Sequence, residues 1–422
     1  MVEFIKIINK GKYFYMLLMF LWCAYTAPFL KPFDSNYLIT SFLYIGICAY
    51  YFFFLNNPKQ NIKPLCITLG IMIGWWILQC VKVGSFTNID FRLVYSIIIC
   101  HIAFSLYKGK EFFWYFEKVL VHLTIISLVV WFLGSVARDA MYSLVSSISV
   151  WNNGNTTYGN MIVVGLGNQR IYDTILRNIG FTWEAGRFSS FLVVGLFNNL
   201  LIHNFKFKGN KPFFIFLIGL ITTFSTTGIG AALGVLLLYV YNKSMKIRIF
   251  LIVLCILLFP SIFALDFIGG KIRDNIDVEA EVRNMEYSFN VYNTTQITPQ
   301  RFTGLYLDLQ NWFHDFWLGY NLNENSYVVK YVFRGSSVWL SDGIIQIFSK
   351  YGLFVGLFFY WQLFKSSIKL SKDFNYKGTM LFALAFILIS ISYDFWSSGI
   401  MLYFILYALY KNTDKKRINY NL

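Results

Sequence analysis

The stretch Phe112–Gly134, FFWYFEKVLVHLTIISLVVWFLG, decides the fold class because its apolar run is long enough to cross a bilayer. A helix rises about 1.5 Å per residue, so roughly 20 apolar residues span a hydrocarbon core of about 30 Å. Other stretches that meet or approach that length are Tyr13–Leu30, Tyr37–Leu55, Pro64–Val81, Phe91–Tyr107, Phe188–Asn204, Ile247–Phe267, Val338–Leu363, Thr379–Tyr393 and Trp396–Tyr410.

Pro212–Tyr241 is long for one span, and Ser225-Thr-Thr-Gly228 in its middle is typical of a turn. We therefore expect two shorter spans joined by a tight hairpin. The whole pattern predicts an all-α, polytopic helical membrane protein with about 12 transmembrane helices, residues 1–422 forming a single integral-membrane domain.

Composition supports this class, because 57% of residues are hydrophobic and only 14% are charged. The net charge of +15 does not indicate nucleic-acid binding, since the basic residues do not gather on a soluble face. Most Lys and Arg occupy short links that twelve spans would place on the side of the N-terminus, whereas the opposite short links hold Lys31 and Lys82. The positive-inside rule then predicts that both termini are cytoplasmic. The six cysteines lie inside apolar spans and show neither disulfide nor metal-ligand spacing.

Two hydrophilic stretches are predicted on the extracytoplasmic side, residues 135–187 and residues 269–337. In the second, Thr298-Pro299 resembles a helix start, and Leu305, Leu309 and Trp312 recur at helical spacing beyond it. This segment predicts an amphipathic helix lying in the membrane interface.

The first candidate site is the segment RNIGFTWEAGR, in which Arg177, Gly180, Glu184 and Arg187 would share one face of a helix. Arginine suits a diphosphate because its planar fork donates paired, charge-assisted hydrogen bonds. Glu184 would orient Arg177 or accept a proton from an attacking hydroxyl. A solvated charge cluster beside the membrane is the plainer alternative.

Further candidates lie elsewhere in the chain. Arg301 falls in the predicted interfacial helix, and His314, a residue type able to act as a base, follows near its end; an ordinary surface role is the alternative for both. Arg92 lies one turn into a span near its outer end, where it would face a cavity, bind phosphate or extend to the headgroups. The Phe224–Gly230 hairpin would allow close helix packing or present donors to an anion.

In this order the pieces resemble the bacterial O-antigen polymerase and O-antigen ligase superfamily. The resemblance covers about residues 170–356, and its motifs are short. They are Arg177-x-x-Gly180-x-x-x-Glu184, Thr223-Phe-Ser-Thr-Thr-Gly228, Arg301 with Phe316-Trp-Leu-Gly319, and Tyr351-Gly-Leu-Phe-Val-Gly356. Ligases of the superfamily carry a His-Asn pair where this chain has Ser341-Asp342, a departure that favours polymerase over ligase.

The resemblance implies a metal-independent membrane glycosyltransferase without a cofactor, a surface-polysaccharide polymerase in the bacterial inner membrane. Its substrates would be undecaprenyl-diphosphate-linked oligosaccharides, joined at the periplasmic face, with Glu184, Arg177 and Arg301 as catalytic residues and Arg187 and Arg92 as further diphosphate ligands. Membrane lipid and a separate chain-length regulator are the other partners expected. A ligase, and a flippase for lipid-linked oligosaccharides, are the alternatives; the flippase would require charged residues deep in the spans and broken helices.

Overall fold

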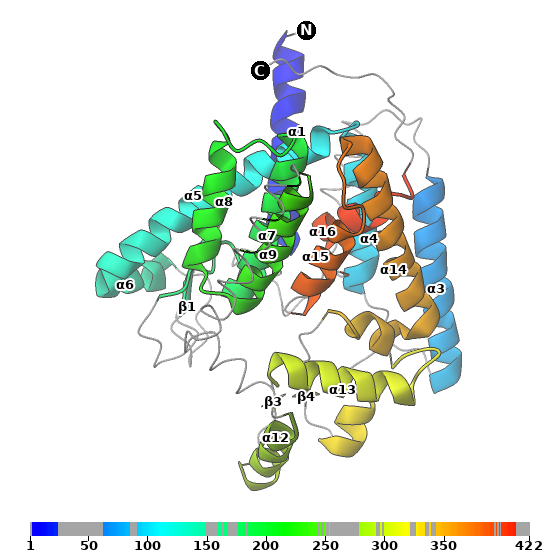
Figure 1. The fold of residues 1–422 in the computed structure, drawn as a ribbon. Helices are drawn as coiled ribbons and strands as arrows, with labels where there is room; N and C mark the ends of the chain where they lie inside the picture. The colour runs from blue at the N-terminus through cyan, green and yellow to red at the C-terminus, as the bar shows by residue number, and fades with distance from the viewer. Residues whose placement is uncertain are drawn as a thin grey trace.

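The computed structural model describes residues 2–23, 62–84, 91–148, 158–161, 164–167, 176–182, 184–242, 278–292, 296–297, 299–320, 326–333, 337–338, 343–391 and 398–410, together with Met245, Ile249, Val253, Asp394 and Trp396. Most of this part of the chain is helical (Figure 1). The helices are α1 (Val2–Cys23), α3 (Lys63–Val83), α4 (Phe91–Leu106), α5 (Glu111–Val136), α6 (Arg138–Ile148), α7 (Ala185–Ile202), α8 (Lys211–Thr222), α9 (Thr226–Tyr241), α12 (Val278–Tyr292), α13 (Arg301–His314), the π-helix η3 (Val328–Val332), α14 (Gln346–Phe374), α15 (Leu381–Ser390) and α16 (Gly399–Leu406).

Two small sheets add to the helices. Strands β1 (Tyr158–Met161) and β2 (Val164–Gly167) form an antiparallel hairpin, and β3 (Gln296–Ile297) pairs in parallel with β4 (Ser337–Val338). Both sheets fall in the stretches predicted as loops, so these stretches are partly folded. The first is also shorter than predicted, because α5 extends to Val136 and α7 begins at Ala185.

Among the described residues, four helices are long and apolar enough to cross a membrane: α3, α5, α7 and α14. The expected number of about twelve is not reproduced. One reason is that several apolar stretches form helices of only 10–17 residues, such as α8, α9 and α15, because turns and polar residues end them early. Tyr37–Leu55 lies outside the described residues, and so does Ile247–Phe267 apart from Ile249 and Val253. The chain is thus a helical membrane protein by length and composition of its helices.

The predicted hairpin is confirmed, since α8 ends at Thr222 and α9 begins at Thr226.

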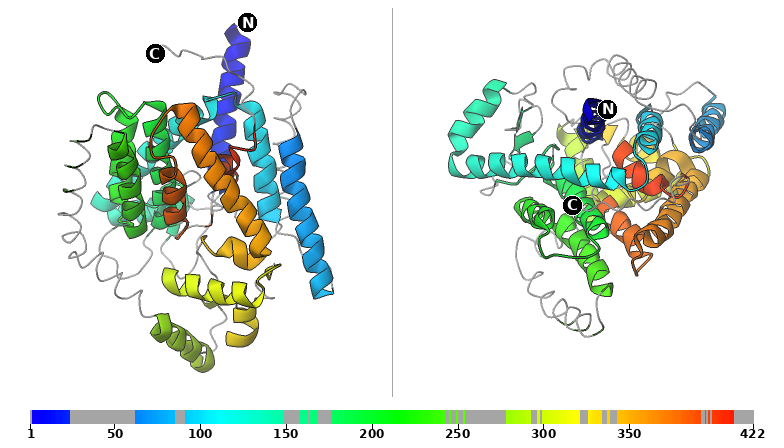
Figure 2. Two further views of the ribbon diagram at one scale, coloured as in Figure 1. Left: turned by 45° about the vertical axis from the view of Figure 1, so that its right-hand side comes forward. Right: turned by 90° about the horizontal axis from the view of Figure 1, so that it is seen from above.

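Helix α7 forms the centre of the bundle, since nearly all of its residues are buried. It packs against α5, α8 and α9, while α16 packs against α4 and α14 on the other side (Figures 1 and 2). A polar seam ties three of these helices together. Buried Glu117 of α5 accepts a hydrogen bond from Asn199 of α7 at 2.5 Å and pairs with His203 Nε2 at 3.0 Å. Asn199 in turn exchanges hydrogen bonds with Asn210, the N-cap of α8.

One end of the bundle gathers lysines, and we call it the basic end. Lys12 pairs with Glu111, Lys110 lies 4.3 Å above the ring of Phe374, and the link at Lys377 pairs with Asn242 at the end of α9. Helices α12 and α13 lie at the opposite end, which we call the loop end (Figure 1). The starts of α7 and α9 point toward the loop end, because both helices finish at the basic end.

The second predicted loop contains a helix, α13, which begins later than the predicted start at Pro299. Its N-cap is Gln300, so the helix begins at Arg301. The residues that it buries are Thr303, Gly304, Leu307, Asp308 and Asn311. Phe302, Tyr306 and Phe313 are exposed. The buried polar residues have partners in three neighbouring elements. Thr303 donates to Glu281 of α12, Asn311 Oδ1 accepts the Val328 N–H of η3 at 2.9 Å, and Asp308 bonds to α14.

Candidate functional site

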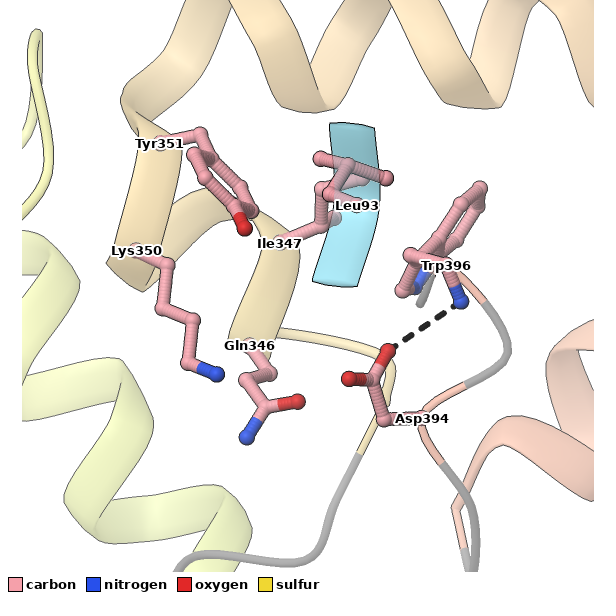
Figure 3. A pocket seen from close by; sticks show the side chains of 7 residues that line it. All are labelled: Leu93, Gln346, Ile347, Lys350, Tyr351, Asp394 and Trp396. Atoms are coloured by element: carbon pink, nitrogen blue, oxygen red, sulfur yellow. Dashed lines mark hydrogen bonds between the residues drawn. The ribbon is translucent and has the colours of Figure 1, made fainter. Parts of the chain in front are cut away.

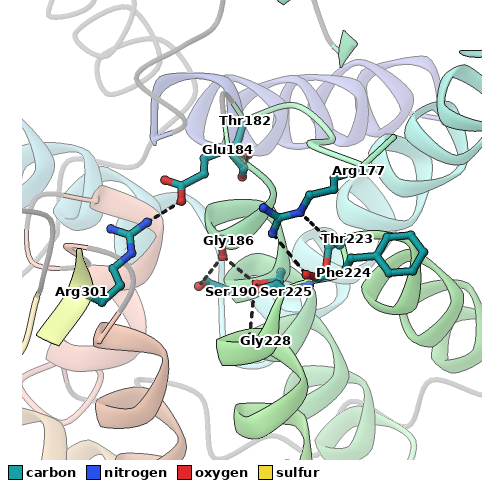
Figure 4. A network of polar contacts seen from close by, with 11 residues as sticks. Arg177, Thr182, Glu184, Gly186, Ser190, Thr223, Phe224, Ser225, Gly228 and Arg301 are labelled. Carbon is teal, nitrogen blue, oxygen red and sulfur yellow. Dashed lines mark hydrogen bonds and ion pairs between the residues drawn. The ribbon is translucent and has the colours of Figure 1, made fainter. Parts of the chain in front are cut away.

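An ion pair between Glu184 and Arg301 lies at the start of α7. Glu184 is the N-cap residue of α7, yet its carboxylate makes no capping hydrogen bond to the helix. Instead, Glu184 Oε1 accepts a hydrogen bond from Nη2 of Arg301, the first residue of α13 (Figure 4). The two side chains are 17% and 25% exposed, so the pair is shielded but still reachable by a ligand. The ion pair thus joins the second loop to the central helix.

Arg177 lies on the other side of the same helix start. Its Nε donates to the carbonyl oxygen of Thr223 at 3.0 Å, and its Nη2 donates to that of Phe224 at 3.3 Å. Both carbonyls belong to the turn between α8 and α9, where Phe224 has a left-handed φ of 47°. Figure 4 shows the guanidinium groups of Arg177 and Arg301 on either side of Glu184, both turned toward the start of α7. Two arginines distant in sequence are therefore brought to one place.

The segment before α7 is held as a turn by Asn178 and Gly180. Asn178 N donates to Thr222 O at 2.9 Å, and its side-chain amide donates to Thr222 Oγ1 at 3.0 Å. The Asn178 side-chain oxygen accepts from the Gly180 N–H at 3.0 Å. Gly180 has a φ of 57°, and a Cβ there would lie 2.4 Å from the ring of Phe188. Glycine is therefore required at this position for conformation and for space.

This turn overturns the prediction that residues 177–187 form one helix. Residues 176–182 are not helical and α7 begins only at Ala185, so Arg177, Gly180, Glu184 and Arg187 do not share a helix face. The reason is that the left-handed Gly180 and the bonds to α8 fix a different backbone. Glu184 was expected to orient Arg177. Among the described residues it pairs with Arg301 instead, and no contact between Glu184 and Arg177 is seen.

The start of α9 lies against the start of α7. Ser225 is the N-cap of α9 and accepts the Gly228 N–H at 3.2 Å, and Ser189 Oγ of α7 donates to Ser225 Oγ at 3.0 Å. A Cβ on Gly228 would lie 2.4 Å from Cβ of Ser189, so only glycine permits this approach. Four residues of the Thr223–Gly228 motif thus have a physical role. Thr223 and Phe224 offer carbonyls to Arg177, Ser225 caps α9, and Gly228 permits the close contact.

These charges favour an anion. Arg187 is the third residue of α7, and Arg301 is the first residue of α13. A helix start carries about half a positive charge, so a cation there is disfavoured by about 0.3–1 kcal/mol. Glu184 pairs with Arg301, and Glu281 accepts the Gln300 N–H at 2.8 Å beside it. An anion between Arg177 and Arg301 would be bound in the manner of anions at helix starts.

The structure places the remaining predicted residues as follows. Arg187 is half-buried in the first turn of α7. Arg92 is the second residue of α4. His314 ends α13, so 13 residues at about 1.5 Å separate it from Arg301 by roughly 20 Å along the helix, and its ring stacks on Tyr327 at 3.4 Å. His314 is therefore not brought to the ion pair. Ser341 and Asp342 lie outside the described residues.

Sequence reasoning missed the residues that attach α13 to the bundle. Asp308 of α13 is fully buried, and its Oδ1 accepts the Ser349 hydroxyl of α14 at 2.7 Å. Buried Gln79 of α3 donates to the carbonyls of Leu318 at 2.6 Å and Lys350 at 2.9 Å. The sequence contained no clear signal that Asp308 is buried, because α13 carries several other polar residues, such as Thr303 and Asn311. The only sequence sign of the role of Gln79 was that it is an amide within an apolar span.

Gly319 and Gly352 make this attachment possible. Both have left-handed φ values, 71° and 76°, and Gly352 interrupts α14. A Cβ on Gly319 would lie 2.4 Å from the Lys350 carbonyl, and one on Gly352 would lie 2.0 Å from Trp317 O. Leu353 N then donates to Phe316 O at 3.0 Å across the break. The turn after α13 is thus seated on a broken helix of the bundle.

Comparisons with known proteins do not assign the chain: no family model, no curated protein and no solved structure matches it. Within the described residues, no three His, Cys, Asp or Glu side chains are grouped closely enough to hold a metal ion.

Proposed function

We propose that this protein is a surface-polysaccharide polymerase that joins undecaprenyl-diphosphate-linked oligosaccharides at the extracytoplasmic face of a bacterial inner membrane. The observation that carries the proposal is the Arg301–Glu184 ion pair at the start of α7, with Arg177 on its other side. It lies at the loop end, away from the lysines of the basic end, which positive-inside orientation would put in the cytoplasm. Two of the motifs that resemble the O-antigen polymerase superfamily, Arg177–Glu184 and Thr223–Gly228, meet at this place with Arg301.

The proposed reaction uses these groups as follows. A hydroxyl of one lipid-linked repeat unit attacks the anomeric carbon of the growing glycan, and the bond from that carbon to the diphosphate breaks. Undecaprenyl diphosphate leaves with the bonding electrons, and Arg177 and Arg301 neutralise its charge. Glu184 accepts the proton of the attacking hydroxyl once the diphosphate has drawn Arg301 away. Preorganised donors of this kind supply about 3–4 kcal/mol of transition-state stabilisation each.

The proposal includes the finer topology of about twelve spans with both termini cytoplasmic. The short apolar helices α8, α9 and α15 then cross only with help from neighbouring segments or from local thinning of the bilayer. Residues 135–187 and 269–337 form the extracytoplasmic vestibule in which the sugars are held. A separate chain-length regulator would act from the same side.

A second candidate function is transport of lipid-linked oligosaccharide across the membrane. The observation that favours it is the interruption of α14 at Gly352, because broken helices are typical of transporter binding sites. The polymerase is preferred since the break seats the turn after α13 by backbone hydrogen bonds, with Leu353 N donating to Phe316 O at 3.0 Å. A ligase that transfers the finished glycan is the remaining alternative.

The test is the surface polysaccharide of a strain lacking this gene, complemented with wild type, Arg177→Ala, Glu184→Ala or Arg301→Ala. We expect each variant to insert normally, to display single repeat units and to lose the long-chain ladder on a gel, a loss of at least 100-fold in polymer. Arg283→Ala is the matched control, because Arg283 is 68% exposed on α12 and pairs with Glu279 one turn away.

The outcomes separate the three functions. If all three variants still produced the full long-chain ladder, Arg177, Glu184 and Arg301 would not form the polymerisation site. Finished lipid-linked polymer that accumulates in the deletion strain would indicate a ligase. Repeat units trapped on the cytoplasmic side would indicate a transporter.

A further inference from the structure

Helix α13 begins without a cap from its own N-cap residue. That residue is Gln300, whose side chain makes no hydrogen bond to the helix, and glutamine is not among the residues that usually fill this position. A helix start leaves backbone N–H groups without a partner inside the helix. In a capping box, a glutamate three residues into the helix accepts the N–H of the N-cap residue. Here that third position is Thr303, which has no carboxylate.

Glu281 of α12 supplies the missing carboxylate. Its Oε1 accepts the Gln300 N–H at 2.8 Å, and its Oε2 accepts a hydrogen bond from the hydroxyl of Thr303. Thr303 is fully buried and Glu281 is half-buried, so water has little access to these bonds. Glu281 thus does from a second helix what the glutamate of a capping box does from within the same helix.

Arg301 lies inside this arrangement. It is the first residue of α13, between Gln300 and Thr303 in the sequence, and its guanidinium pairs with Glu184 at the start of α7 (Figure 4). Glu281 therefore holds the chain on both sides of Arg301. A cation in the first turn of a helix is disfavoured by the helix dipole, and the negative charge of Glu281 at the same place opposes that effect.

The other half of α13 rests on a closely packed base. Asp308 bonds to Ser349 of α14, and Tyr320 N donates to Ser349 O at 2.9 Å. The pocket at the start of α14, shown in Figure 3, has about 10 Å³ of free space, enough for one water molecule and for no part of a substrate. Beside it, Asp394 accepts the Trp396 N–H at 3.1 Å. This half of the helix is therefore fixed by the bundle.

The first turn of α13 lies away from this base. Seven residues at about 1.5 Å each separate Asp308 from Arg301, which is roughly 10 Å along the helix. A tilt of α13 about Asp308 moves the first turn most, because displacement grows with distance from the fixed point. Val282 of α12 packs against the apolar cluster that contains Leu307, so α12 keeps a contact with this loop when Glu281 is replaced.

We propose that Glu281 is a positioning residue for the diphosphate site: it fixes the first turn of α13 so that the Arg301 guanidinium stands opposite Arg177. The inference rests on the proposed function for the ligand, a lipid diphosphate, whereas the positioning is a property of the free protein. Glu281 does not touch the substrate and acts through Arg301. A diphosphate then meets two guanidinium groups already in place, which lowers the entropy lost on binding.

The position of the first turn is tested by electron paramagnetic resonance on the full chain in detergent, without ligand. Spin labels are attached to Phe302→Cys and Val81→Cys after the native cysteines are replaced, because these side chains are 43% and 73% exposed. We expect Glu281→Ala to broaden the distribution of distances between the labels at least twofold. Glu281→Gln keeps an acceptor and a donor in the same place and should leave the distribution narrow. Glu279→Ala is the matched control, because Glu279 lies on the same helix and is 86% exposed.

The consequence for the site is tested with undecaprenyl diphosphate lacking sugar as the probe. Glu281→Ala should weaken its binding at least 10-fold in a protein that keeps Arg301, but less than twofold in Arg301→Ala, because Glu281 acts through that arginine. Glu281→Gln and Glu279→Ala should bind as wild type does. An equal loss in both backgrounds would indicate general damage to the fold and would overturn the positioning role.

The two measurements separate failure of this inference from failure of the proposed function. A narrow distance distribution or an unchanged affinity in Glu281→Ala would refute the positioning role, and the proposed function would stand if Arg301→Ala still weakened binding. If wild type does not bind the lipid diphosphate while Glu281→Ala broadens the distribution, the proposed function fails and the positioning of Arg301 by Glu281 stands.

Discussion

At the residue scale, the turn before α7 depends on Gly180. Its φ of 57° and the 2.4 Å approach of a Cβ to the Phe188 ring leave no room for a side chain. We expect Gly180→Ala to lower the free energy of unfolding by about 1–3 kcal/mol, the usual cost of overpacking combined with a strained backbone. Because the turn positions Arg177, polymer synthesis should also fall.

Thermal unfolding in detergent measures this effect, with Gly70→Ala as the control. A Cβ on Gly70 in α3 would meet nothing within 4 Å, and alanine favours a helix over glycine, so stability should stay the same or rise by up to about 1 kcal/mol. Equal melting temperatures for wild type and Gly180→Ala would contradict the assigned role of the turn.

The sequence could indicate at this scale which residues matter, but not how they meet. The spacing of Arg177, Gly180 and Glu184 predicted that they belong to one site. It could not predict the pairing of Glu184 with Arg301, because that contact joins residues 117 positions apart. The helical arrangement expected for the segment was wrong since a left-handed glycine and bonds from Asn178 to α8 outweigh local helical spacing.

At the element scale, the interruption of α14 seats the second loop. A Cβ on Gly352 would fall 2.0 Å from the Trp317 carbonyl oxygen, a backbone atom that cannot rotate away. We expect Gly352→Ala to insert in the membrane but to release the turn at 316–320 from the bundle. The predicted consequence is at least 10-fold faster cleavage by a protease added at the extracytoplasmic side, together with loss of polymer.

The matched control is Gly74→Ala in α3, where a Cβ would have nothing within 4 Å. Its cleavage rate should equal that of wild type. Protection of Gly352→Ala equal to wild type would show that the turn does not depend on the break in α14.

Apolar length predicted several helices to within a few residues. The expected Phe112–Gly134 is α5 at Glu111–Val136, and the expected Phe188–Asn204 is α7 at Ala185–Ile202. The break in α14 could not be predicted in the same way, because it is fixed by a turn from another part of the chain. The buried face of α13 was missed for a similar reason, since Asp308 is buried only because Ser349 provides a partner.

Across the whole molecule, the lysine cluster of the basic end and the candidate site lie at opposite ends. Lys12, Lys110 and Lys377 gather where α9 and α14 finish, whereas Arg177 and Arg301 lie where α7 and α9 begin. Helix α9 ends at the basic end and α12 lies at the loop end (Figure 1).

This arrangement predicts which positions can be reached from outside the cell. In a background whose native cysteines are replaced, we expect Lys330→Cys to react with a membrane-impermeant maleimide in intact spheroplasts, because Lys330 is exposed at the loop end. Lys208→Cys, exposed in the link between α7 and α8 at the basic end, should react only after the membrane is permeabilised. The cysteine-free parent gives the background. If Lys208→Cys alone reacted in intact spheroplasts, the protein would have the opposite orientation in the membrane. Arg177, Glu184 and Arg301 would then face the cytoplasm and could not reach a substrate displayed on the outer face.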